Sequence, residues 1–170
     1  MSPSTGDAMS AATLSKMFEF TYNVTMQNIQ GFDHEDSLRQ PDQAGNCLNW
    51  LLGHMVETRN GILDLLGEER IWTPEESKNY VRGSEPIRND SAALRWEKIT
   101  GDFDASQERL RVGLAKLTAE QLGSPLPLDK NPFGLESVGM MLGAFSFHES
   151  YHAGQIGLLR RVLGRDGMIN

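Results

Sequence analysis

The stretch Met141–Leu163 reads MLGAFSFHESYHAGQIGLLRRVL and constrains the fold more than any other part of the chain. Apolar residues and two histidines recur in it at intervals of three and four, the spacing of one face of a helix. That face consists of Met141, Phe145, His148, His152, Ile156, Leu159 and Leu163. A helix with one apolar face is stable when that face packs against other helices, so partner helices are expected elsewhere.

Three further segments show the same helical spacing of apolar residues. They run from about Ala11 to Ile29, from Cys47 to Leu66, and from Asp90 or Ser91 to about Leu117, and the quoted helix extends from about Glu136 to Leu163. The sequence has no convincing strand pattern and no internal repeat. Since four amphipathic helices must bury their apolar faces against one another, we predict an all-α fold, a four-helix bundle forming a single domain over residues 1–170.

The second helix and the connection that follows it carry clear boundary signals. Asn46 is suited to cap the start of this helix, and Gly67 is suited to end it. A long connection, residues 68–89, then separates the second and third helices, and its prolines and glycine predict a surface segment. Because it exceeds the usual length of a loop, it is a candidate functional or lid segment.

The composition excludes several classes of protein. The chain has 16 basic and 23 acidic residues and a net charge of -7, which argues against nucleic acid as a partner. No apolar run approaches the roughly 20 residues that cross a bilayer, so no membrane partner is expected, and the amino terminus lacks a secretory signal pattern. The lone cysteine, Cys47, excludes an intrachain disulfide and fits a reducing compartment. We therefore expect a cytoplasmic protein in which Cys47 is a small core residue.

Three of the four histidines occupy positions where an apolar residue is expected. His148 and His152 lie four residues apart, so they project from one helix face and can reach a common point. His54 lies on the apolar face of the second segment, one turn from Trp50. The fourth histidine, His34, lies in a polar stretch and is expected to be solvated.

The three inward-facing histidines favour a metal site over a purely structural role. A single histidine on an apolar face is usually a hydrogen-bonded core residue. Two neighbouring buried imidazoles, however, cost desolvation energy and repel each other when protonated. A divalent ion accepts both lone pairs, and a third imidazole strengthens the prediction. Three neutral nitrogens leave coordination positions open, as in catalytic sites, and zinc, nickel and ferrous iron all accept imidazole.

The residues His148–His152 also match the H-E-x-x-H pattern of zinc peptidases, in which the glutamate is the general base. Those enzymes take a third ligand from downstream, but the extended motif's third histidine position is Leu158 here, and the only acid after His152 is Asp166. The peptidase interpretation is therefore disfavoured. Glu149 remains a candidate catalytic residue, although it lies about 100° around the helix from His148 and is equally well explained as a solvated or salt-bridged residue.

Two stretches carry a resemblance to a known family. NWLLGHMVETRN (residues 49–60) contains His54, and FHESYHAGQIGLLRR (residues 147–161) contains the pattern H-x-x-x-H-x-G-Q. With the helix count and the long second connection, they resemble the DinB/YfiT-like superfamily of metal-binding four-helix bundles over nearly the whole chain. The resemblance implies that His54, His148 and His152 bind zinc, nickel or iron. It places Gln155 at the motif's glutamine, either hydrogen-bonded to a metal ligand or as a buried polar residue.

Members of the superfamily include low-molecular-weight thiol S-transferases and a mycothiol-dependent maleylpyruvate isomerase. The resemblance thus implies a metal-dependent S-transferase or hydrolase acting on a small electrophilic substrate, with a low-molecular-weight thiol as a further cofactor. A bound divalent ion lowers the pKa of a thiol or water, and Glu149, Glu57 and Tyr151 are the candidates for proton transfer. For Glu57 and Tyr151, a role as packing or surface residues is the favoured alternative. The alternative is a non-catalytic metal-binding stress-response protein. As in relatives, a homodimer is also expected.

Overall fold

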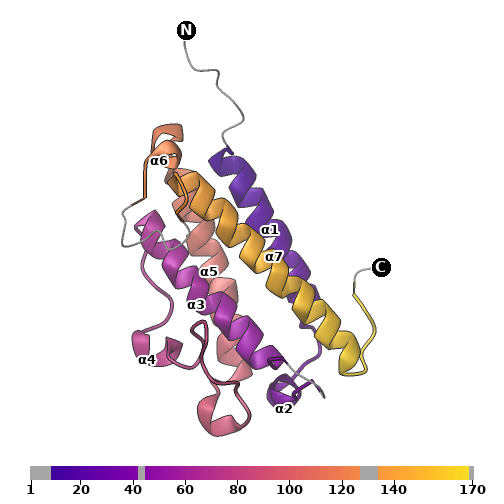
Figure 1. The fold of residues 1–170 in the computed structure, drawn as a ribbon. Helices are drawn as coiled ribbons and strands as arrows, with labels where there is room; N and C mark the ends of the chain where they lie inside the picture. The colour runs from indigo at the N-terminus through magenta and orange to yellow at the C-terminus, as the bar shows by residue number, and fades with distance from the viewer. Residues whose placement is uncertain (1–8, 42–44, 127–133, 169–170) are drawn as a thin grey trace.

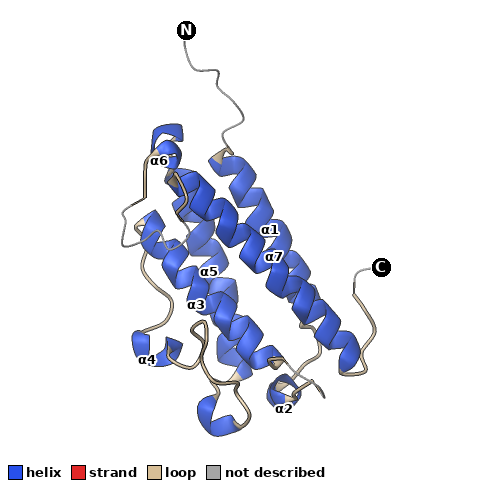
Figure 2. Cartoon of the chain, in the orientation of Figure 1, coloured by secondary structure: helices blue, strands red, loops and turns tan. Residues whose placement is uncertain are grey.

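The computed structural model describes residues 9–41, 45–126 and 134–168, and this described part is helical, without strands. Figures 1 and 2 show a bundle of four long helices, α1 (Ala11–Asn28), α3 (Leu48–Leu66), α5 (Trp96–Lys116) and α7 (Val138–Val162). Shorter helices in the connections are α2 (His34–Leu38), α4 (Pro74–Ser77), η1 (Asp90–Ala92) and α6 (Ala119–Gly123). The prediction of an all-α four-helix bundle is confirmed.

Each long helix packs against two others. Helix α3 contacts α5 and α7, and α1 contacts the same two helices, so α1 and α3 lie across the bundle from each other (Figure 1). The side chains of Leu48, Leu52 and Met55 on α3 have no exposed surface. Burial of one such side chain contributes about 1.5–3 kcal/mol, so α3 is fixed firmly between α5 and α7.

The ends of α3 agree with the sequence only in part. Gly67 ends the helix in the left-handed conformation, with a φ of 69°, as predicted. The start is different, because Cys47 rather than Asn46 is the capping residue, and it makes no side-chain capping hydrogen bond. The Cys47 side chain is fully buried, with its sulfur 3.6 Å from the carbonyl oxygen of Ile87. The prediction that Cys47 is a core residue is confirmed, and the capping role predicted for Asn46 is wrong.

Helix α5 begins at Trp96, later than the predicted start at Asp90 or Ser91. The residues before it form the single turn η1 and then an extended segment. The backbone N–H of Leu94 donates to the hydroxyl of Tyr80 at 2.6 Å. This distant partner replaces the hydrogen bond that the N–H would make within a helix, a contact that local sequence patterns do not reveal.

His34 is buried and hydrogen-bonded at both ring nitrogens, so the prediction that it is solvated is wrong. It lies in α2 and is 8% exposed. Its Nδ1 accepts the backbone N–H of Trp96 at 3.1 Å, and its Nε2 is 2.5 Å from a carboxylate oxygen of Asp90. Because Nδ1 is an acceptor, Nε2 carries the proton and donates it to Asp90. His34 therefore fixes the chain just before α5 and has no part in the histidine cluster described below.

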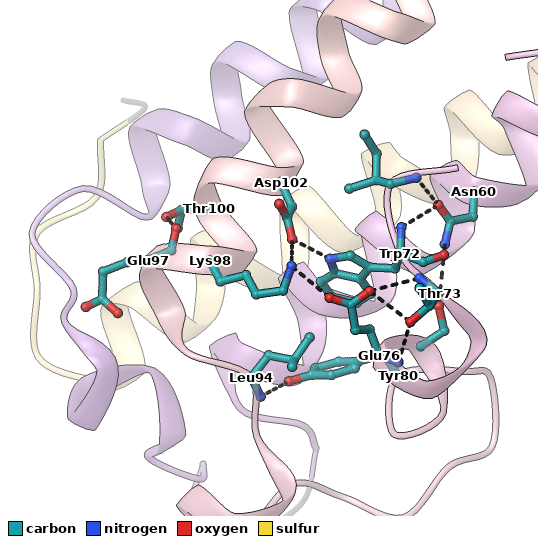
Figure 3. Close-up of polar contacts among 12 residues, drawn as sticks. Asn60, Trp72, Thr73, Glu76, Tyr80, Leu94, Glu97, Lys98, Thr100 and Asp102 are labelled. Atoms are coloured by element: carbon teal, nitrogen blue, oxygen red, sulfur yellow. Dashed lines mark hydrogen bonds and ion pairs between the residues drawn. The ribbon is translucent and has the colours of Figure 1, made fainter. Parts of the chain in front are cut away.

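The connection between α3 and α5 lies mainly on the surface, as predicted, but a few of its side chains are buried and anchor it to the bundle. Trp72, Tyr80 and Ile87 in this connection are each 1% exposed. The side-chain oxygen of Asn60 on α3 accepts the backbone N–H groups of Ile71 and Trp72, at 2.8 and 3.2 Å (Figure 3). The connection is thus held against α3 by both backbone hydrogen bonds and buried aromatic rings.

A second set of contacts holds the same connection against α5. The indole N–H of Trp72 donates to Asp102, and Lys98 bridges Asp102 at 2.7 Å and Glu76 at 3.0 Å (Figure 3). Glu76 also accepts the backbone N–H of Thr73 at 2.9 Å, which caps α4. With anchors on both α3 and α5, this connection has a defined position and can deliver residues to a functional site.

The outer face of α1 and α7 carries large apolar side chains. Phe20 is 71% exposed and Leu158 is 66% exposed. Contiguous exposed side chains of this kind are typical of surfaces that bind another protein. The homodimer stays a prediction, which sedimentation velocity tests.

The described part of the chain contains no helix with the length and hydropathy of a membrane span.

We predict that Gly53→Ala destabilises the protein. A Cβ atom at this position of α3 would lie 2.2 Å from Cδ1 of Tyr80, so the tyrosine ring and the connection that carries it must move. Overpacking of this kind costs about 1–3 kcal/mol in the free energy of unfolding, measured by urea denaturation.

Gly101→Ala on α5 is the matched control, because a Cβ atom there meets nothing within 4 Å. The control is expected to stabilise the protein by about 0.5–1 kcal/mol through the lower backbone entropy of the unfolded chain. Equal effects of the two substitutions would contradict the close packing of Tyr80 on Gly53.

Candidate metal centre

Three imidazole rings from two helices meet inside the bundle. His54 comes from the second turn of α3, and His148 and His152 come from consecutive turns of α7. The Nε2 atom of His148 is 3.2 Å from Nε2 of His54 and 3.1 Å from Nε2 of His152. Nitrogen atoms of all three rings lie within 4.8 Å of one another. The structure therefore brings together the three predicted ligands, and binding of the metal itself stays a prediction.

Two of the rings are oriented by acceptors on their outer nitrogens. The Nδ1 atom of His54 is 2.7 Å from the backbone carbonyl oxygen of Tyr80, and Nδ1 of His152 is 2.6 Å from Oε1 of Gln155. Because carbonyl oxygens only accept hydrogen bonds, both Nδ1 atoms carry protons and both Nε2 atoms present lone pairs to the cluster. The indole ring of Trp50 also stacks on His54, with 4.7 Å between ring centroids. The hydrogen bond from His152 to Gln155 fits the prediction that Gln155 is hydrogen-bonded to a metal ligand.

Burial keeps the three rings neutral. Loss of solvent lowers the pKa of His54, and it lowers the pKa values of both His148 and His152 to about 4. For His148, the neighbouring His152 and His54 lower the pKa further. Neutral imidazoles are the form that binds a metal ion, so the cluster is ready to coordinate at neutral pH.

The donor set fits a divalent ion better than it fits a hydrogen-bonded cluster. His148 faces two acceptor nitrogens, so a proton on its Nε2 satisfies only one of them. A proton on its Nδ1 is no better, because this buried atom has no hydrogen-bond partner among the described residues. A cation at the three Nε2 atoms removes the conflict between lone pairs. The two Nε2–Nε2 distances are also close to the roughly 3.3 Å between ligands of a tetrahedral zinc ion with bonds of about 2.0–2.1 Å.

The cluster opens on a pocket of about 960 Å³, large enough for a small molecule. Most of its wall is apolar or aromatic: Trp50, Gly61, Leu135, Met141, Ala144, Phe145 and Phe147. Four polar side chains accompany the histidines: Glu57, Thr58, Arg82 and Tyr151. A reactant beside the histidine nitrogens would therefore be surrounded mainly by apolar surface.

Two of the predicted proton-transfer candidates line this pocket. Glu57 lies one turn after His54, and burial raises the pKa of its carboxyl group. Tyr151 is 56% exposed, and its hydroxyl group accepts a hydrogen bond from Nε2 of Gln155 at 3.4 Å. Gln155 thus connects Tyr151 to His152. Both residues are accessible to a bound reactant, and their role in proton transfer stays a prediction.

Glu149, the third candidate, is outside the pocket wall and fully buried. Both of its carboxylate oxygens accept hydrogen bonds from Arg59, from Nε at 2.7 Å and from Nη2 at 2.9 Å. Arg59, also fully buried, donates in addition to the carbonyl oxygen of Phe103 and to Ser106 on α5. Of the alternatives that the sequence left open, the geometry favours the salt-bridged residue, because the carboxylate ties α7 to α3 and α5 and is not free to accept a proton from a reactant.

The sequence did not reveal the partners of these residues. Tyr80 acts through its backbone carbonyl oxygen, which leaves no trace in the residue type, and Arg82 comes from a connection that was predicted to lie on the surface. A weaker signal existed for Arg59 and Glu149: Arg59 is the one basic residue of α3, and Glu149 is the one acidic residue of α7. Opposite charges on two helices that pack together favour a buried pair, since neither charge is stable alone in the core.

Comparisons with known proteins agree with this fold. Residues 17–156 match the family model of the DinB superfamily. The crystal structure of a conserved protein from Enterococcus faecalis is similar, with a TM-score of 0.69 and 16% sequence identity, over 92% of this chain and 98% of that chain. At this identity the likeness shows the fold alone. A comparison with curated proteins finds no match.

The metal-free protein should lose stability on acidification because of the cluster. His148 and His152 have pKa values of about 4 in the folded state, below the ordinary value of 6.5 in an unfolded chain. Between these values the unfolded state binds more protons, so the contribution to stability is complete above pH 6.5 and is lost as the pH falls toward 4. The melting temperature of the chelator-treated protein should therefore fall as the pH is lowered from 6.5 toward 4, and His148→Leu should make this dependence on pH less steep. An equal dependence of the melting temperature on pH in the wild-type protein and in His148→Leu would contradict the lowered pKa of His148.

Substitution of Glu149 should reduce the stability of the protein, because its carboxylate is a partner in a buried ion pair. Glu149→Leu leaves the guanidinium of Arg59 buried without its partner, which costs about 3–5 kcal/mol in the free energy of unfolding. The double variant Arg59→Met/Glu149→Leu should recover most of this loss, because it removes both charges. A Glu149→Leu variant with normal stability but no activity would instead establish the carboxylate as a catalytic group.

Proposed function

The chain belongs to the DinB superfamily, and on that premise we propose that it is a metal-dependent enzyme, a thiol S-transferase or a hydrolase that acts on a small electrophilic substrate. The observation that carries this proposal is the meeting of three Nε2 atoms at the wall of the pocket. His54, His148 and His152 would hold the ion, with zinc or nickel as the favoured metals and iron as a third choice. The localisation that we propose is cytoplasmic.

A divalent ion bound there would lower the pKa of a thiol or a water molecule, which supplies the nucleophile for either reaction. The residues of this chain have separate tasks around it. Tyr80 and Gln155 hold His54 and His152 in the form whose Nε2 atoms face inward. The apolar wall excludes water and receives the body of the reactant. Glu57 and Tyr151 are placed to take or give a proton at their carboxyl and hydroxyl oxygens.

The zinc peptidase remains disfavoured, now for a further reason. The glutamate of the H-E-x-x-H pattern would have to act as a general base, but both oxygens of Glu149 are held by Arg59. The non-catalytic metal-binding protein is the alternative. It has the same three ligands and differs only in turnover, so an assay separates the two.

The first test is metal content. We expect one divalent ion per chain in the purified protein, measured by elemental analysis, and a loss of tenfold or more in metal affinity for His54→Ala. His34→Ala is the matched control, a buried histidine outside the cluster, and should keep the metal. Equal retention of metal in both variants would overturn the three-histidine site.

The second test is turnover. Metal-loaded protein is assayed with several low-molecular-weight thiols and a chromogenic electrophile, and with a chromogenic ester for hydrolysis. We expect turnover that disappears on chelation and in His54→Ala. Absence of turnover with every thiol and ester at full metal occupancy would contradict the enzyme and support the binding protein.

A further inference from the structure

We propose that Arg82 binds a carboxylate of the ligand and thereby selects acidic small molecules with an apolar body. The inference rests on the proposed function, because it takes the three-histidine pocket as the place where the reactant binds. It adds the chemical class of that reactant, which neither the fold nor the histidines specify.

The position of Arg82 is set by anchors on both sides. Two residues earlier, Tyr80 is buried, donates from its hydroxyl group to Asn49 at 2.8 Å, and holds His54 through its carbonyl oxygen. Two residues later, Ser84 accepts the indole N–H of Trp50 at 2.9 Å. The backbone that carries Arg82 is therefore fixed to the same helix as His54. Its side chain lines the pocket that contains the three imidazoles.

The guanidinium group of Arg82 has no protein partner to neutralise it. Within residues 9–41, 45–126 and 134–168, no carboxylate lies within ion-pair distance of Arg82, whereas Arg59, Arg70 and Arg111 each pair with one. Glu57 shares the pocket, but the arginine that acts on its carboxyl group is Arg70. Arg82 is exposed, and within the described part of the chain Arg88 of the same connection also lacks an ion pair, so the distinguishing feature of Arg82 is its place in the wall of the histidine pocket.

The chemistry of the pocket wall defines the ligand. A guanidinium group offers a planar fork of N–H donors that matches a carboxylate in a bidentate pair. The remaining wall, with Trp50, Phe145 and Phe147, suits an aromatic or aliphatic body. The predicted ligand therefore carries a carboxylate for Arg82 and an apolar part, and it has its reactive atom at the histidines. The carboxylate can belong to the thiol or to the electrophilic substrate.

Binding of matched probes tests the proposal without any need for turnover. Isothermal titration calorimetry compares 4-phenylbutyrate with its uncharged amide, 4-phenylbutyramide, on zinc-loaded and zinc-free protein. We expect the carboxylate to bind about tenfold more tightly than the amide, as for a hydrogen-bonded charged pair, with or without zinc. Arg82→Gln should abolish this preference. Arg88→Gln should keep it, because Arg88 lies in the same connection, is exposed and is not part of the pocket wall.

Two results would overturn the proposal. One is a preference for the carboxylate that survives in Arg82→Gln but disappears without zinc, since the carboxylate would then bind the ion. The other is equal binding of acid and amide by the wild-type protein. Metal content of each variant is measured in parallel, so a failure of the metal site is recognised separately from a failure of Arg82.

A further pair of probes identifies the source of the carboxylate. If it belongs to the thiol, 3-mercaptopropionate should bind the zinc-loaded protein at least tenfold more tightly than propionate, and Arg82→Gln should weaken both. If it belongs to the substrate, the thiol group should add nothing and 4-phenylbutyrate should bind most tightly of the three. Either result, with dependence on Arg82, supports the assignment.

Discussion

Three neutral imidazoles from α3 and α7 present nitrogen atoms to one another, with Nε2 of His148 at 3.2 Å from that of His54 and at 3.1 Å from that of His152. Two of these nitrogens are fixed as acceptors by the groups behind them, and the third cannot satisfy both. Burial makes the alternative of protonation costly. A cation between the rings would satisfy all three nitrogen atoms. Without it, at least one buried nitrogen lacks a hydrogen-bond partner in the described part of the chain, which costs free energy. The hydrogen bonds that Tyr80 and Gln155 accept from the histidines, and the chemistry proposed for the pocket, both depend on this constraint.

The two helices that supply the rings are held in register by a separate interaction. The buried pair of Arg59 and Glu149 joins α3 to α7 beside the cluster, and Arg59 also reaches α5. A buried ion pair adds little net stability compared with apolar residues, but it penalises any arrangement that separates the charges. Any displacement of α3 relative to α7 would break this pair, and the same two helices carry the three imidazoles. The glutamate of the H-E-x-x-H pattern thus has a structural explanation.

Local periodicity was sufficient to predict the four helices and the three inward-facing histidines, because helix faces and i,i+4 pairs depend only on nearby residues. It failed where partners are distant in sequence. His34 is buried through Asp90 and Trp96, and α5 starts late because Tyr80 takes the N–H of Leu94. Arg82 and the Tyr80 carbonyl reach the site because buried side chains such as Tyr80 and Ile87 anchor the connection between α3 and α5 to the bundle. The sequence of that connection, rich in turn residues, is typical of an exposed loop.

X-ray absorption spectroscopy of the metal-loaded protein is the most direct test of the central claim. We expect a spectrum with three imidazole nitrogens, at about 2.0–2.1 Å if the ion is zinc, and one or more oxygen or sulfur ligands from water or thiol. A spectrum with fewer than three imidazoles, or one dominated by carboxylate oxygens, would contradict it.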